Sequence, residues 1–392
     1  MFGFSVEVAR AVNILCVLTT TFVMYRLASK IVGSKAAFWA SAIYLTTPVT
    51  IQGISSLDMA DTSLLPLLFL WTAAVLRRLT LRPTAGNVWL LGACLGLCMW
   101  AKVSATIALS VSLCMGVVVL ALCSERRSFW IYGRFIAIAC GIGFAIYLIS
   151  SFAILNGLWG RDAFLFPWRA AYTAVFNRGE SRGVAALFSA GYSLLKIIVW
   201  FSPYLLLIWS WTICTAFIEH AKDKTLENKF CLWINSAATF YFLVHIFIGG
   251  TNYGFPRYHV VLLPVVSIMT GKFLAESLPN VWQKENLLPG VIALMASIGL
   301  LALIPDPLLY LNIHLKQLLL MDSGYSEILW RTIFVLIPLY GLPFAAACAL
   351  LRIRILRGSG GTLKTILATS LFITVLFLNS HQSVASYRTG VQ

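Results

Sequence analysis

Hydrophobic residues in this chain gather in long runs that short polar connections separate. About twelve of these runs approach the roughly 17 to 25 residues with which an α-helix crosses a bilayer. Two runs are short, which predicts tilted or broken helices. No internal repeat divides the chain, so residues 1–392 are expected to form a single integral membrane domain. The runs lie at 12–31, 36–54, 62–75, 88–100, 103–123, 129–158, 192–217, 230–249, 259–278, 287–304, 329–351 and 363–378.

The composition agrees with this pattern. Hydrophobic residues make up 60% of the chain and charged residues 11%, against about 25% charged residues in soluble domains. This excludes a soluble globular protein, a disordered chain and a disulfide scaffold. The nine cysteines are scattered without metal-binding spacing, and the signature motifs of soluble nucleotide-binding and hydrolytic enzymes are missing. The predicted fold is an all-α polytopic bundle of transmembrane helices.

The net charge of +15 indicates how the chain lies in the membrane. Most basic residues fall in alternate connections, including Arg77, Arg78, Lys272 and Arg352. The positive-inside rule places these connections in the cytoplasm and the loops on the opposite side in the exoplasmic space. The same rule accounts for the charge, so a nucleic-acid partner is not expected.

Two of the few acidic residues, Asp58 and Asp61, lie at the expected exoplasmic mouth before the run 62–75. If the helix begins at Leu57, their i, i+3 spacing places both carboxylates on one face. The helix dipole also favours anions at this end. The pattern is equally typical of an ordinary helix N-cap, so capping and catalysis both remain open.

Isolated cations mark two further positions at the ends of apolar runs. Lys102 lies between 88–100 and 103–123 with no acidic residue nearby in sequence. It is either a lysine that extends to the lipid headgroups or a functional group, since ionisable residues inside membranes are costly. Arg257 and Tyr258 precede the run 259–278; they suit phosphate binding or an interfacial anchor. His259 is read as a packing residue rather than a base.

Two long connections are expected on the exoplasmic side, at 159–191 and 305–328. The first interleaves arginines, among them Arg161, with aromatic residues such as Phe166 and Trp168. This composition predicts an interfacial helix on the membrane surface. The helix can also cover a site for a lipid phosphate and a sugar.

Several segments, in this order, resemble the polyprenyl-phosphate-dependent membrane glycosyltransferases of the C-type fold. The nearest branch is the protein-mannosyltransferase and aminoarabinose-transferase-like group. Residues 7–33 are similar to the family's second helix, and 57–69 to its Leu-x-x-x-Asp-x-x-Leu segment, with Asp61 on the aspartate. Residues 96–102 are similar to its Gly-Leu-x-x-x-x-Lys element, and 257–264 to its Arg-Tyr-x-x-x-x-x-Pro element.

The resemblance implies inverting transfer of a sugar from a polyprenyl-phosphate donor to a lipid, glycan or protein acceptor on the exoplasmic face. Asp61 or Asp58 would be the catalytic carboxylate, and Lys102, Arg257, Tyr258 and Arg161 would bind the substrate. The family's first helix and first acidic loop have no counterpart before Glu7. A missing segment or a partner subunit is therefore expected to supply them.

Several alternatives stay open. The alternatives to a glycosyltransferase are a transporter of lipid-linked glycans and a catalytically inactive scaffold subunit. No cofactor is implied with certainty, although two carboxylates are compatible with a divalent metal. The expected location is a bacterial inner membrane, in contact with its lipids. The sugar, the acceptor and the oligomeric state are not encoded in any motif of the sequence.

Overall fold

A computed structural model describes the N-terminal two thirds of the chain together with a few short pieces. The described residues are 6–47, 49–50, 60–123, 126–176, 190–191, 193–194, 197–198, 201–248, 257–278, 341, 345 and 368–372. Within these ranges the regular structure is helical and no strand occurs. The predicted all-α fold is confirmed.

The helices begin and end close to the predicted runs. The first four are α1 (Val6–Ile31), α2 (Ser34–Thr46), the π-helical turn η1 (Ala60–Leu64) and α4 (Leu65–Leu81). They are followed by α5 (Ala85–Ala101), α6 (Val103–Cys123), α7 (Arg126–Ser151), the π-helical turn η2 (Phe152–Asn156), α8 (Gly157–Trp159) and α9 (Arg161–Phe176). The last are α11 (Pro203–Lys222), α12 (Leu226–Ile248), α13 (Arg257–Val260) and α14 (Leu263–Ser277).

Six helices among the described residues are long and apolar enough to cross a membrane. They are Glu7–Ile31, Ala60–Leu81, Val103–Cys123, Trp130–Trp159, Pro203–Lys222 and Leu226–Phe247, and α5 is a shorter apolar helix. The predicted span at 287–304, and most of those at 329–351 and 363–378, lie outside the described residues. The chain is thus a multi-pass membrane protein, while the count of about twelve spans stays a prediction.

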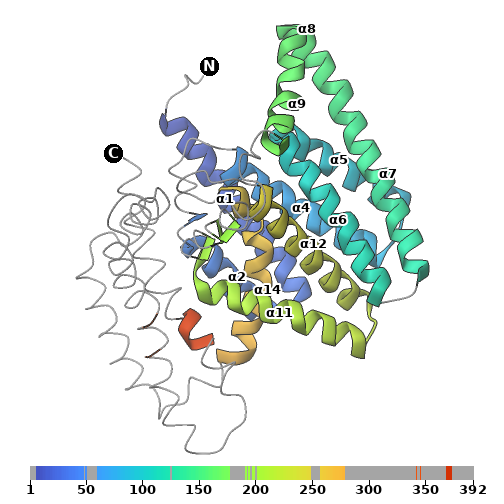
Figure 1. The fold of residues 1–392 in the computed structure, drawn as a ribbon. Coiled ribbons are helices and arrows are strands. Elements are labelled where there is room, and N and C mark those ends of the chain that lie inside the picture. Colours follow the sequence, from blue (N-terminus) through green and yellow to red (C-terminus); the bar gives the residue numbers. More distant parts are fainter. Residues whose placement is uncertain are drawn as a thin grey trace, which may run out of the picture.

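The helices pack in two neighbouring groups (Figure 1). Helices α5, α6 and α7 contact one another, and α12 packs on α6 and α4. Helices α2, α14 and α11 form the adjoining group. Trp233 joins α12 to α6: its indole Nε1 donates to the carbonyl of Leu113 at 3.0 Å, and its ring lies against Gly116.

Small residues allow α5 and α7 to approach closely. A Cβ atom added to Gly92 would lie 2.6 Å from Ile142 Cγ2, and one added to Gly143 would lie 2.8 Å from the carbonyl oxygen of Gly92. The spacing Gly92-x-x-x-Gly96 is typical of close helix packing. In this structure it forms a packing face inside the fold.

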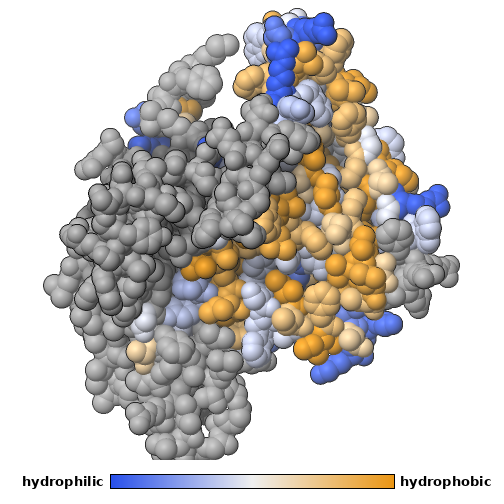
Figure 2. Space-filling view, in the orientation of Figure 1, coloured by the Kyte–Doolittle hydropathy of each residue, from blue (hydrophilic) through white to orange (hydrophobic). Residues whose placement is uncertain are grey.

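The outer surface of the bundle is apolar, as expected for contact with lipid tails. Exposed side chains on α7 include Trp130, Ile138, Phe144 and Ile149. Figure 2 shows hydrophobic residues over the middle of this face and hydrophilic ones toward its upper and lower ends. This distribution suits helices that run between two polar membrane surfaces.

Candidate active site at one end of the bundle

Asp61 lies in the first turn of η1 and is 2% exposed. Its Oδ2 atom accepts a hydrogen bond from the ammonium group of Lys102. The Nε atom of Arg257 lies 4.0 Å from the same oxygen. Burial of a carboxylate is costly unless cations compensate it, so these two basic side chains account for its place in the interior.

The three charged groups come from segments that are far apart in the sequence. Lys102 has an extended backbone (φ −165°, ψ 111°) and separates α5 from α6. Arg257 begins α13. Lys102 and Arg257 were both expected to bind the substrate, and Asp61 is the group that both approach.

Tyr258 completes the cluster. The Nζ atom of Lys102 lies 4.3 Å from the centre of the Tyr258 ring, and the guanidinium carbon of Arg257 lies 5.3 Å from it. Both contacts have the geometry of cation–π interactions. The described part of the cluster thus joins two cations, one carboxylate and one aromatic ring.

A cavity of about 730 Å³ opens beside this cluster. This volume is in the range of sites for small molecules. Its wall is formed by the junction of α5 and α6, by Tyr147 of α7, by Phe166 and Pro167 of α9, and by α12 and α13. Lys102 is the only charged residue of the wall that the described segments provide, and most of the other groups are apolar. Asp61 is not part of this wall.

The other expected site residues fall in different places. Asp58 lies outside the described residues, so its role stays a prediction. Arg161 is exposed at the start of α9 and does not line the cavity, although α9 does. His259 is buried, packs edge-on against the Phe242 ring at 5.1 Å, and directs Nε2 toward the Phe242 carbonyl at 3.4 Å.

Sequence reasoning did not single out His245, which also lines the cavity. Its ring stacks on Tyr241 with 4.2 Å between ring centres and lies nearly parallel to Tyr258 at 5.9 Å. The residue sits inside the apolar run 230–249, where helical periodicity alone does not distinguish it from core residues. The available signal was an ionisable group inside a membrane span.

The described residues contain no group of three or more His, Cys, Asp and Glu side chains that could hold a metal ion. Asp61 shares its carboxylate with two cations. Asp58, the second carboxylate of the predicted pair, lies outside the described residues, so a divalent metal at this pair stays a prediction.

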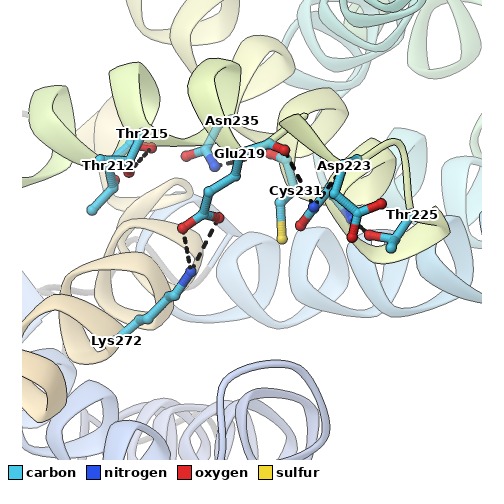
Figure 3. A network of polar contacts seen from close by, with 9 residues as sticks. Thr212, Thr215, Glu219, Asp223, Thr225, Cys231, Asn235 and Lys272 are labelled. Carbon is cyan, nitrogen blue, oxygen red and sulfur yellow. Dashed lines mark hydrogen bonds and ion pairs between the residues drawn. The ribbon is translucent and has the colours of Figure 1, made fainter. Parts of the chain in front are cut away.

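The opposite end of the bundle carries a different set of polar contacts (Figure 3). There Lys272 of α14 donates to both carboxylate oxygens of Glu219 of α11, at 3.1 and 3.2 Å. Arg77 of α4 pairs with Glu227 of α12. A small pocket of about 70 Å³ adjoins the first pair, with Asn235 and Cys231 in its wall.

The helical architecture is that of the C-type fold. A similar solved structure is the crystal structure of ArnT from Cupriavidus metallidurans bound to undecaprenyl phosphate, with a TM-score of 0.51 and 19% sequence identity. The match covers 98% of this chain and 65% of that protein, so the chain spans about two thirds of its length.

The apo crystal structure of the same ArnT matches with a TM-score of 0.47 and 17% identity, over 96% of this chain and 62% of that one. No protein-family model and no curated protein matches the chain by sequence. The likeness therefore shows the fold, and function has to be argued from the site.

Proposed function

We propose that this chain is a membrane glycosyltransferase that moves a sugar, with inversion, from a polyprenyl-phosphate donor to an acceptor at the exoplasmic end of the bundle. The observation that carries the proposal is the position of Lys102, a cation on the wall of a largely apolar cavity of about 730 Å³. An apolar wall suits a prenyl chain, and a cation at its edge suits the phosphate. The solved structure of ArnT with undecaprenyl phosphate lends support.

The charged cluster suggests a role for each group. Lys102 and Arg257 neutralise the phosphate of the donor and the charge that develops as the phosphate departs. Tyr258 holds both cations through its ring. Asp61 is buried and engaged by both cations, so we assign it to positioning them. Asp58, or a group supplied by a partner or another segment, then deprotonates the acceptor.

One observation favours a second candidate, a protein that binds or transports lipid-linked glycans without transferring the sugar. The Asp61 carboxylate is held by Lys102 and is not available as a base in this arrangement. A binding protein needs the cavity and the cations but no base. The two candidates therefore share one ligand site and differ in turnover.

The experiment measures binding of undecaprenyl phosphate to the purified chain in detergent. Lys102→Met should weaken binding about ten- to a hundredfold, the usual effect of a lost charged hydrogen bond. Lys102→Arg keeps the charge and should retain most of the affinity, and Lys272→Met at the other end should bind as the wild type does. Equal affinity of the wild type and Lys102→Met would contradict the proposal.

A second readout separates the two candidates. Incubation with undecaprenyl-phosphate sugars and a panel of acceptors should release undecaprenyl phosphate if the chain is a transferase. Binding that depends on Lys102 without any such release, also after addition of candidate partner subunits, would favour the transporter.

A further inference from the structure

His245 is a polar group of the cavity wall to which the proposed function assigns no role. It lies near the end of α12, on the same wall as Lys102 and Tyr258. The Tyr241 ring stacks on it at 4.2 Å, and the His259 ring meets it edge-on at 6.0 Å. The imidazole is therefore held in place from several sides and cannot easily turn away from the cavity.

The contacts of the ring also define which nitrogen is left for a ligand. Nδ1 of His245 lies 3.0 Å from the backbone carbonyl oxygen of Tyr241. A carbonyl oxygen only accepts hydrogen bonds, so Nδ1 carries the hydrogen and donates it. Nε2 is the remaining nitrogen, and in the neutral ring it holds a lone pair.

The charged end of the ligand would lie next to this nitrogen. The Tyr258 ring has the Lys102 ammonium 4.3 Å away and the His245 ring 5.9 Å away. The second pKa of a phosphate monoester is about 6, so near neutral pH part of the population keeps one proton. That proton can lie between a phosphate oxygen and Nε2, so the two groups form a hydrogen bond.

We infer that His245 is a further ligand-binding residue, whose Nε2 atom accepts a hydrogen bond from the protonated phosphate oxygen of polyprenyl phosphate, the lipid monoester that remains when the sugar departs. This inference rests on the proposed function. Among the described residues, the titratable groups whose rings contact His245 are Tyr241, Tyr258 and His259, and Lys102 lies over the Tyr258 ring. The three rings hold the His245 imidazole in position, and the Nε2 atom remains to bind the ligand.

Two substitutions separate binding from packing. In His245→Asn the amide nitrogen replaces Nδ1 and can still donate to the carbonyl of residue 241, while Nε2 is lost. The same helix shows that this bond forms, because Asn235 donates to the carbonyl of Cys231 at 2.9 Å. In His245→Gln the longer amide reaches the place of Nε2, while the bond of Nδ1 is lost. A ligand contact and a packing role thus predict opposite rankings.

The test measures the affinity of the purified chain for undecaprenyl phosphate, together with the thermal stability of each variant. His245→Asn should bind about ten- to a hundredfold more weakly, and His245→Gln should stay within about threefold of the wild type. Inorganic phosphate at the same concentration should not compete, since it leaves the apolar wall unfilled.

Two results would overturn the inference alone. In the first, His245→Asn has the affinity of the wild type while Lys102→Met binds weakly. In the second, His245→Gln binds undecaprenyl phosphate more weakly than His245→Asn does. Failure of the wild type to bind undecaprenyl phosphate, or binding that Lys102→Met leaves unchanged, would overturn the proposed function and this inference with it.

Discussion

The two ends of the helix bundle both carry ion pairs, yet they differ in burial and in charge balance. At one end the side chain of Asp61 is 3% exposed and two cations share it beside a cavity of about 730 Å³. At the other end Glu227 and Glu219 are 41% and 44% exposed, and each pairs with one cation near a pocket of about 70 Å³.

This difference separates a ligand site from a structural contact. Exposed pairs contribute about 0 to 1 kcal/mol each, because water competes for both partners. They connect helices, as Lys272 and Glu219 connect α14 to α11. The Asp61 end instead buries its carboxylate against two cations, and one of them, Lys102, lines an apolar cavity where an anion can reach it. We therefore assign the lipid phosphate to the Asp61 end.

The largest effect is expected for Asp61→Asn. Loss of the charge leaves Lys102 and Arg257 without their shared carboxylate, and breaking a buried pair costs about 3 kcal/mol or more. Thermal unfolding in detergent should show a large fall in stability, which undecaprenyl phosphate partly restores because it supplies a new anion.

The matched control is Asp162→Asn, which removes a carboxylate from an exposed pair with Arg169 at the same end. It should leave stability within about 0.5 kcal/mol of the wild type. If Asp61→Asn is as mild as this control, Asp61 is only a helix cap, and the contrast between the two ends is lost.

An intermediate effect is expected for Gly143→Ala, which alters the wall of the cavity. The new Cβ atom would lie 2.8 Å from the Gly92 carbonyl oxygen and would push α7 away from α5. We expect a loss of about 1 to 2 kcal/mol in thermal stability. Binding of undecaprenyl phosphate should also weaken, since Tyr147 of the cavity wall lies one turn further along α7.

Gly141→Ala is the control, because its Cβ atom meets nothing within 4 Å. An equal loss of stability in both variants would refute the packing argument.

The smallest effect is expected at the opposite end. A double-mutant cycle with Lys272→Met and Glu219→Gln should give a coupling energy below about 1 kcal/mol. Affinity for undecaprenyl phosphate should not change in either variant. A coupling above about 3 kcal/mol, or a change in affinity, would mean that this end resembles the Asp61 end.

Much of the fold followed from hydrophobic run length. The run 103–123 coincides with α6 (Val103–Cys123), and 230–249 agrees with α12 within a few residues. Such runs are predictable because a bilayer leaves the backbone few alternatives to a helix. Lys102 and Arg257 were also recognisable from the sequence, because ionisable residues at the ends of such apolar runs are rare.

What the sequence did not reveal is which residues meet in three dimensions. The catalytic role of Asp61 stays a prediction, and nothing in its neighbourhood along the chain shows that Lys102 pairs with it from 41 positions away. His245 was missed because it meets Tyr258, a residue of another helix, only in the folded chain. Helix packing determines both facts, and periodicity along one helix does not report them.

The most direct test of the account is a cryo-electron microscopy structure of the chain in lipid nanodiscs with undecaprenyl phosphate. We expect the phosphate within hydrogen-bond distance of Lys102 Nζ and beside Arg257, with the prenyl chain along the apolar wall that Tyr147 and Phe166 provide. A phosphate bound near Lys272 and Glu219, or a prenyl chain that leaves this cavity empty, would contradict the assignment of the ligand to the Asp61 end.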